Sequence, residues 1–365
     1  MAECYREFAE GGFGLVITEG TYTDKVFAQG DLHQPGLTDD AQAAAWHHVV
    51  EEVHAAGGKI VAQLMHAGAL SQGNPHRTGT AGPSATVPKG AQMAHFRGAG
   101  PYRMPDEMAA AAIAEAVAGF AAASVRARGA GFDRVEVHGA NGYLLDQFLT
   151  EGVNRRTDAY GGQAAARVRL MAETVRAVRA AAGPDFLVGV RVSQAKVNDH
   201  AHSWAGREDD ARTIFPALAA GGADYIHTTE HEAWRPAFKD GGPTLAALAK
   251  KHSGLPVIAN GGLHNPAAPP PCWTPGRRTW PHLPAAHWRN RTGRSACAAD
   301  GPCWSLTAAH WNPWPTSPTR TRAAQAAAEP NRAGWQPLPL SVEQQRDLHP
   351  STTGAEHGNR DSTWR

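Results

Sequence analysis

The chain has 365 residues and 42% of them are apolar, which is enough for one large core or for a (β/α)₈ barrel with extensions. A formal net charge of +1 gives no reason to expect a nucleic acid as partner. Because the sequence lacks both a run of about 18 apolar residues and the apolar stretch of a signal peptide, we expect no membrane span and a cytoplasmic protein. Four cysteines without CxxC spacing exclude a disulfide scaffold and disfavour structural zinc.

Strand and helix patterns alternate along the first 265 residues. Short β-branched runs predict buried parallel strands, and longer stretches with apolar residues at helical spacing predict helices. Pro105, followed by two acidic residues, is typical of a helix start. Six βα-type units predict a parallel sheet covered by helices. The expected strands are 12–20, 59–66, 132–138, 186–193, 223–229 and 255–262, and the expected helices are 39–56, one opened by Pro105, 164–182, 208–220 and 244–252.

Polar residues stand at the end of each predicted strand. Functional groups at the carboxyl ends of many parallel strands are typical of a (β/α)₈ TIM barrel, and we predict that fold. The sequence contains no GxGxxG, GxxxxGK[ST] or HExxH motif, which argues against a dinucleotide fold, a P-loop and a zincin helix. The strand-end residues are Thr18, Glu19, Gly20, Gln63, His66, Glu136, His138, Arg191, His227, Glu230, Asn260, Gly261 and Gly262.

Composition changes sharply near Pro266. The last 100 residues hold 15 Pro, 8 Trp and 11 Arg, but no Lys, Ile, Phe, Tyr or Met. Such a segment is not expected to build strands or an ordinary core. The sequence therefore predicts a barrel domain at 1–265 and an irregular, disordered or out-of-frame tail at 266–365. A Pro/Trp-rich interaction tail is the alternative.

The longest motif is HGANGYLLDQFL at 138–149, followed by NRRTDAYGG at 154–162. Together with ITEG (17–20), AQLMHAG (62–68), VGVRVS (188–193) and IANGG (258–262), it resembles the old yellow enzyme family of NADH:flavin oxidoreductases. The resemblance implies an FMN-dependent ene-reductase that takes NADH or NADPH as reductant and acts on a small electron-poor alkene. It implies neither a nucleic acid nor a membrane as partner, and it allows a homo-oligomer.

The resemblance also implies three catalytic residues. His138 and Asn141 would hydrogen-bond the carbonyl or nitro oxygen of the alkene, where donors fixed in advance stabilise developing negative charge. Tyr143 would then deliver a proton to the α-carbon.

Further residues would hold the cofactor. Gln63 and the backbone of Gly20 would lie at the flavin pyrimidine edge, and Arg191 would lie near N1 and the C2 carbonyl, where a cation stabilises reduced flavin. The phosphate would bind the backbone at a helix start. The residues implied for half of that phosphate site are Asn260, Gly261 and Gly262.

Structural roles compete with several of these assignments. Gln63 could satisfy backbone groups, Arg191 could pair with Glu136 or Asp224 inside the barrel, and His66 could be either a flavin neighbour or structural. The segment 156–162 is expected to fix a loop over the site. A different enzyme class, a metal-dependent barrel hydrolase, would be built on Glu19, His66, His138 and His227, although none of these stands at metal-ligand spacing.

Two departures from the family pattern stand at the ends. The family has a further strand before the helix that corresponds to 3–10, and an eighth strand within about 20 residues of IANGG that ends in a Gly-Arg pair. Gly276-Arg277 has no strand pattern before it. We therefore expect an incomplete barrel of strands two to seven with two open edges. A catalytically inactive or unstable fragment of the family is the corresponding alternative.

Overall fold

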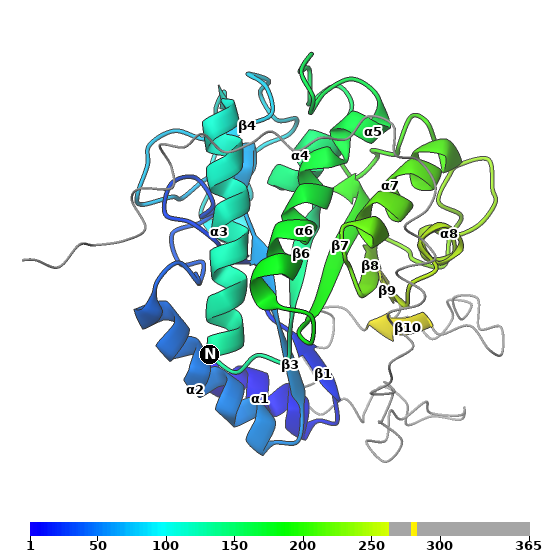
Figure 1. Cartoon of the computed structure of the whole chain (residues 1–365). Coiled ribbons are helices and arrows are strands. Elements are labelled where there is room, and N and C mark those ends of the chain that lie inside the picture. Colours follow the sequence, from blue (N-terminus) through cyan, green and yellow to red (C-terminus); the bar gives the residue numbers. More distant parts are fainter. Residues whose placement is uncertain (263–278, 283–365) are drawn as a thin grey trace, which may run out of the picture. The chain divides into compact units, whose positions relative to one another are not determined.

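The computed structural model describes residues 1–262 and 279–282, all of which belong to the unit Met1–Ala309 (Figure 1). The predicted tail at 266–365 lies outside the described residues except for its short segment 279–282.

A single parallel sheet forms the centre of the described unit. Its strands follow the order β1-β3-β6-β7-β8-β9-β10, with β2 paired to β3, so each strand joins its sequence neighbour through a crossover. The sheet curls as a (β/α)₈ barrel does, but among the described residues β1 and β10 do not pair, so the barrel is incomplete. The bounds are β1 Leu15–Ile17, β2 Thr21–Tyr22, β3 Lys59–Met65, β6 Arg134–Asn141, β7 Leu187–Lys196, β8 Tyr225–Thr229, β9 Val257–Asn260 and β10 Thr279–His282.

Helices cover the sheet on one face. In Figure 1, α3 and α6 run side by side in front of the strands, with α2 below and α7 and α8 beyond. A two-stranded ribbon of β4 (Ala81–Gly82) and β5 (Asp106–Glu107) lies apart from the main sheet. The helices are α1 Ala2–Glu10, α2 Asp40–Ala55, α3 Ala110–Gly129, α4 Leu144–Leu149, α5 Ala164–Arg167, α6 Arg169–Ala182, α7 Glu208–Ala220 and α8 Leu245–Ser253.

Local sequence explains where two of these helices begin. The side chain of Asp39 accepts a hydrogen bond from the Gln42 backbone at 2.9 Å, and that of Thr244 accepts one from Ala247 at 3.1 Å. Such caps satisfy donors that the first helical turn leaves open. The expected helices at 39–56 and 244–252 are thereby confirmed to within a residue or two.

The helix start expected at Pro105 is wrong. Asp106 and Glu107 form β5, since the Asp106 backbone donates to Thr80 at 2.8 Å and the Met108 backbone donates to Gly82 at 3.0 Å. The helix begins only at Ala110. Backbone groups bound in a ladder are not available for a first helical turn, and this ladder depends on a strand 25 residues away in sequence.

The expectation that no strand follows Gly262 is also wrong. Thr279–His282 pairs in parallel with Val257–Asn260 and extends the sheet by one strand at its edge. The composition of the last 100 residues predicted no strand, but strand pairing is made by backbone hydrogen bonds, which do not require β-branched side chains. Pro281, which cannot donate, is compatible with an edge position.

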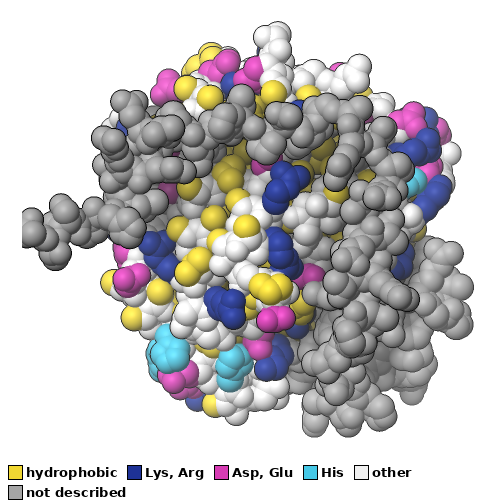
Figure 2. All heavy atoms as spheres, viewed as in Figure 1, with side chains coloured by type: hydrophobic (Ala, Val, Ile, Leu, Met, Phe, Trp, Pro, Cys, Tyr) yellow, Lys and Arg dark blue, Asp and Glu magenta, His cyan; other side chains and the backbone are white. Residues whose placement is uncertain are grey.

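Helix α3 is long and apolar enough to cross a membrane by length and composition alone, although Glu115, Arg126 and Arg128 interrupt its apolar run. Six of its side chains, including Ile113 and Phe120, are buried, and it packs against α6 and the sheet. These contacts are those of a barrel's covering helix. On the face seen in Figure 2, hydrophobic side chains are interspersed with acidic and basic ones.

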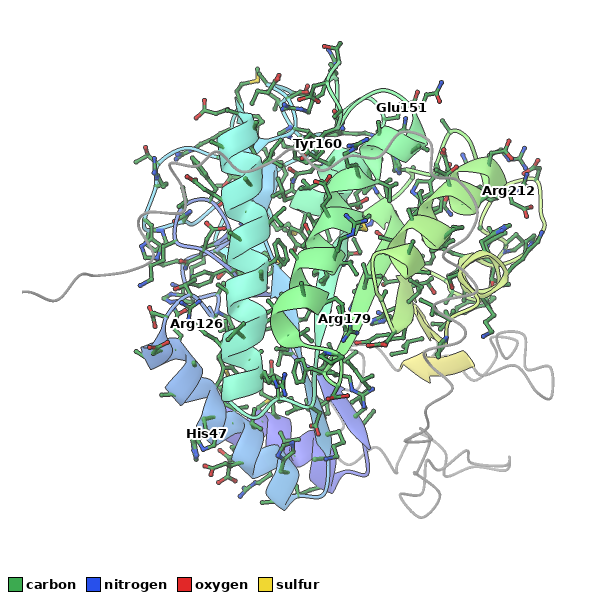
Figure 3. All side chains as sticks on the ribbon, in the orientation of Figure 1. His47, Arg126, Glu151, Tyr160, Arg179 and Arg212 are labelled. Carbon is green, nitrogen blue, oxygen red and sulfur yellow. The ribbon has the colours of Figure 1, made fainter. Side chains whose placement is uncertain are left out.

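At the end of the sheet opposite the polar strand ends, an arginine connects α6 to neighbouring segments. Arg179, labelled on α6 in Figure 3, donates to the carbonyls of Gly222 at 3.1 Å and Gly183 at 2.9 Å, and pairs with Asp224. Asp224 therefore has a partner at the amino end of the strands. In (β/α)₈ barrels, residues at that end contribute to stability, while catalytic residues lie at the carboxyl end.

Candidate active site

Parallel register stacks polar side chains in layers inside the curled sheet. The first layer aligns Gln63 on β3 with Glu136 on β6, and Glu136 with Gly189 on β7. The second layer aligns His138, Arg191 and His227 on β6, β7 and β8. Because side chains two residues apart share a face of a strand, both layers point the same way.

Glu136 is the centre of the first layer. Its carboxylate accepts hydrogen bonds from Gln63 Nε2 at 2.8 Å, from the Tyr225 hydroxyl at 3.1 Å and from His227 Nδ1 at 3.0 Å. Burial alone would raise the pKa of Glu136, but His227, Arg191 and Gln63 together lower it to about 2. The carboxylate is therefore a fixed negative charge inside the barrel.

Gly189 makes room for this layer. A Cβ at this position would lie 2.0 Å from the ring of Tyr225, so only glycine lets that ring cross β7 and reach Glu136. A glycine in the middle of a strand is a signal of such a close approach, but it does not tell which side chain approaches.

His138 is held in the neutral form. It is buried, and burial followed by the charge of Arg191 lowers its pKa to about 3. Its Nδ1 accepts a hydrogen bond from the Ala140 backbone at 3.3 Å. The proton of the neutral ring is therefore assigned to Nε2, which makes this atom of His138 a hydrogen-bond donor.

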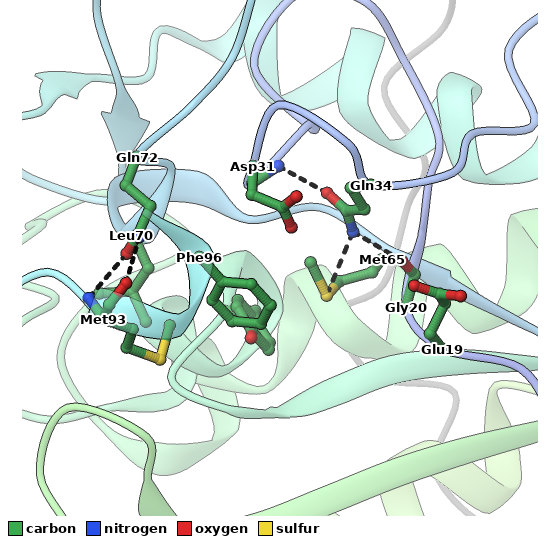
Figure 4. A pocket seen from close by; sticks show the side chains of 11 residues that line it. Glu19, Gly20, Asp31, Gln34, Met65, Leu70, Gln72, Met93 and Phe96 are labelled. Carbon is green, nitrogen blue, oxygen red and sulfur yellow. Dashed lines mark hydrogen bonds between the residues drawn. The ribbon is translucent and has the colours of Figure 1, made fainter. Parts of the chain in front are cut away.

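Tyr143 lies against His138. Their ring centroids are 5.1 Å apart and the planes stand at 80°. Burial, with smaller contributions from Tyr102 and Asp31, raises the pKa of Tyr143 to about 12, so the phenol keeps its proton. Tyr143 and Gly20 both line a cavity of about 110 Å³ (Figure 4).

Asn141 stands between these two residues in a left-handed turn. Asn141 has φ +62° and Gly142 has φ +86°, conformations that asparagine and glycine tolerate best. The Asn141 backbone donates to Ser193 Oγ at 2.8 Å, and the Gly142 backbone donates to Asp146 at 2.7 Å.

A buried ion pair that no sequence motif indicated supports that turn. Lys196 Nζ lies 2.5 Å from Asp146 Oδ1, and the two side chains are 5% and 0% exposed. Burial raises the pKa of Asp146, while Lys196 and the Gly142 backbone oppose the rise. Asp146 and Lys196 stand 50 residues apart in the sequence, so no local spacing indicated the pair, and the β6–β7 pairing brings them together.

Arg191 and Asn260 meet at a third residue. Arg191 Nη2 and Asn260 Nδ2 both donate to Thr229 Oγ1 at 3.2 Å. Arg191 Nε and Asn260 Oδ1 are buried and have no hydrogen-bond partner among the described residues. Asp224, one of the two alternative partners of Arg191, pairs with Arg179, while Glu136 acts on Arg191 through its charge.

The side chain of Gln63 does not serve backbone groups. Among the described residues its Nε2 donates to Glu136, while the Gln63 backbone donates to Thr18 Oγ1 at 3.0 Å. The hydrogen bond to Glu136 thereby orients the Gln63 amide. Its predicted role at a flavin edge stays a prediction.

Gly261 and Gly262 pack closely against the loop after β8. A Cβ on Gly261, which has φ +135°, would lie 1.8 Å from the Glu230 carbonyl oxygen, and one on Gly262 would lie 2.7 Å from the Trp234 ring. The residues after Gly262 that would complete a phosphate site lie outside the described ones up to Thr279. The phosphate role also stays a prediction.

His66 makes structural contacts. Its Nδ1 accepts from the Gly68 backbone at 3.1 Å and its Nε2 lies 3.5 Å from Asp24. Within the described residues no group of three or more His, Cys, Asp or Glu side chains is placed to hold a metal ion, so the metal-hydrolase alternative gains no support. Arg156 fixes the loop after α4, as expected, by donating to the carbonyls of Pro83 at 3.0 Å and Met108 at 2.8 Å.

A curled parallel sheet with layered polar side chains at its carboxyl end defines the class of α/β-barrel enzymes. The model of the NADH:flavin oxidoreductase / NADH oxidase family matches residues 1–269, and the chain belongs to this family. The members are FMN-dependent oxidoreductases, and the predicted resemblance to old yellow enzyme is confirmed.

Named relatives agree with this assignment. The chain is 39% identical over 206 residues to 12-oxophytodienoate reductase 7 of Oryza sativa subsp. japonica, covering 53% of the chain and 50% of the relative. It is 32% identical over 281 residues to NADH oxidase of Thermoanaerobacter brockii, covering 73% of the chain and 40% of the relative. The chain thus spans about half or less of the length of these curated relatives.

Solved structures share the fold. The old yellow enzyme homologue of Zymomonas mobilis superposes with a TM-score of 0.62 at 28% identity, over 71% of this chain and 72% of that one. Morphinone reductase in complex with tetrahydroNAD gives a TM-score of 0.60 at 31% identity, over 71% of each chain.

Proposed function

We propose that this chain forms the catalytic part of an FMN-dependent oxidoreductase that uses NADH or NADPH to reduce an electron-poor alkene. The observation that carries the proposal is the buried, neutral His138, whose ring packs 5.1 Å from that of Tyr143, a residue that lines the cavity. The relatives include a probable flavin mononucleotide-dependent alkene reductase of Leishmania infantum, which supports this reaction class.

The chain's residues fit a flavin. A buried arginine with an unpartnered Nε, among the described residues, beside an asparagine with an unpartnered Oδ1 suits the carbonyls and N–H groups of a flavin ring. When bound, FMN would accept hydride from the nicotinamide and pass it to the β-carbon of the alkene. The residues assigned to hold it are Gly20, Gln63, Arg191, Asn260, Gly261 and Gly262.

The other residues act on the substrate. His138 Nε2 and the Asn141 amide would donate to the carbonyl oxygen and so stabilise the negative charge that develops there. The pKa of about 3 keeps the His138 imidazole uncharged near neutral pH, so His138 would act as a neutral hydrogen-bond donor and not as a cation. The Tyr143 hydroxyl would supply the proton to the α-carbon, where the strong basicity of an enolate compensates for a phenol pKa of about 12.

The visible spectrum of the purified chain before and after addition of FMN tests this function. We expect oxidised-flavin bands that bleach anaerobically with NADH or NADPH and recover when 2-cyclohexenone is added. His138→Ala and Tyr143→Phe should slow the recovery by about 10²- to 10⁴-fold while the bleaching persists. His47→Ala, on the exposed face of α2, is the matched control. A chain that takes up no FMN overturns the proposal and favours the inactive-fragment alternative.

A further inference from the structure

The cavity beside Tyr143 has an unusual mixture of walls. Apolar side chains and two carboxylates line it, and Figure 4 shows the Asp31 carboxylate projecting toward Phe96 and Met65. Among the described residues that line it there is no Lys, Arg or His. The lining residues are Glu19, Gly20, Gly30, Asp31, Gln34, Met65, Leu70, Gln72, Met93, Phe96 and Tyr143.

The loop that carries Asp31 is fixed across the cavity. Gln34 Oε1 accepts from the Gly30 backbone at 2.6 Å, and Gln34 Nε2 donates to the Gly20 carbonyl at 2.6 Å. Asp31 Oδ1 accepts from the His33 backbone at 3.1 Å, which holds the carboxylate in a turn. The negative charge therefore has a defined position at the cavity wall.

The field of Asp31 reaches the reacting groups. Its charge contributes to the raised pKa of both Tyr143 and Glu19, and its effect on Tyr143 exceeds the opposite effect of Arg191. A second carboxylate, Glu19, lines the same space and accepts from the Tyr5 hydroxyl at 3.3 Å. A ligand in this cavity thus meets two negative groups and no positive one among the described lining residues.

We propose that the cavity selects alkenes that carry no negative charge, and that Asp31 is the specificity-determining residue that rejects carboxylate substrates. Neutral enones, and enones with a cationic or hydrogen-bond-donating substituent, are the class that it takes. The apolar walls contact the carbon skeleton of the substrate. Asp31 and Glu19 repel anions, and this repulsion discriminates against carboxylate substrates. This inference rests on the proposed function and adds the substrate class to it.

A matched pair of ligands tests the proposal on the FMN-loaded chain. A cyclohexenone carboxylic acid and its methyl ester differ in charge, and calorimetry gives the dissociation constant of each without turnover. We expect the ester to bind at least about tenfold more tightly than the acid in about 0.02 M salt, and the ratio to fall in about 0.5 M salt, where charges are screened.

A substitution tests whether Asp31 causes the discrimination between the acid and the ester. Asp31→Asn keeps an oxygen that accepts from the His33 backbone, and we expect it to strengthen binding of the acid until the ratio falls to about threefold or less. Asp209→Asn, at an exposed position of α7, should leave the ratio unchanged. Equal binding of acid and ester by the unmodified chain, or an unchanged ratio in Asp31→Asn, overturns this inference alone. Failure of both compounds to bind overturns the proposed function and the inference together.

Discussion

The two sides of the site are built differently. On one side, β6 and β7 are 8 and 10 residues long, and buried polar side chains such as Glu136, Arg191 and Lys196 bind groups on neighbouring strands or on α4. On the other side, β1 and β2 are only 3 and 2 residues long, and the cavity wall comes largely from loops such as 30–34. The long strands fix the donors, and the loops define the space for a ligand.

This difference implies different tolerance to substitution. On the strand side, Glu136 and the Lys196–Asp146 pair have their partners at hydrogen-bond distance, so removal of one partner leaves a buried charge uncompensated. The loop side carries its charges at partly exposed positions, where water takes over a lost interaction. Substitutions on the two sides should therefore differ in their effect on the free energy of unfolding.

The largest effect is expected for Lys196→Met. It leaves the Asp146 carboxylate fully buried without its cation, which should lower the free energy of unfolding by about 3–5 kcal/mol. Lys89→Met removes the exposed pair with Asp199 and should cost about 1 kcal/mol or less. Urea unfolding followed by circular dichroism measures both, and equal costs would mean that the strand side is no more rigid than the surface.

An acid titration should give the next largest effect. The pKa of Glu136 falls from 4.5 to about 2 on folding, so the carboxylate contributes stability above pH 4.5 that is lost as the pH falls toward 2. The loss should amount to about 3 kcal/mol. The stability of Glu136→Gln should therefore fall less steeply between pH 5 and pH 3 than that of the unmodified chain, with Glu115→Gln on the exposed face of α3 as control. Parallel pH profiles for all three chains would contradict the assignment.

Gly189→Ala should be intermediate. The new Cβ lies 2.0 Å from the Tyr225 ring, so the ring must move and its hydroxyl must leave Glu136, at a cost of about 1–3 kcal/mol. Gly129→Ala, in α3 with no atom within 4 Å of the new Cβ, should be neutral or stabilising by up to about 1 kcal/mol. Thermal unfolding distinguishes the two, and a neutral Gly189→Ala would show that the first layer is loosely packed.

The smallest effect is expected on the loop side. Gln34→Ala removes hydrogen bonds to Gly20 and Gly30 and should cost about 1 kcal/mol, because both groups lie near the open cavity. Gln147→Ala removes bonds to the Ala67 and Gly142 carbonyls and the Ala69 backbone, all buried, and should cost about 2–3 kcal/mol. If Gln34→Ala costs as much as Gln147→Ala, the proposed contrast between the two sides fails.

Strands and helices with strong local signals were predictable from the sequence. The β-branched runs around Ile60, Val137 and Val190 became β3, β6 and β7, because apolar residues of that type pack on a pleated, buried surface. The acidic pair after Pro105 led to the wrong prediction of a helix start, because these two residues pair with Ala81–Gly82 in a sheet.

The sequence by itself determined the family, the alternation of strands and helices, and the residues 138–143 as a candidate site, because these are properties of contiguous segments. Only the tertiary structure decided which groups act on one another: Glu136 with Tyr225, Arg191 with Asn260 through Thr229, Lys196 with Asp146. Each pair joins different strands or loops, and parallel register sets its distance. No local pattern encodes that register, since it follows from how the whole sheet buries its apolar faces.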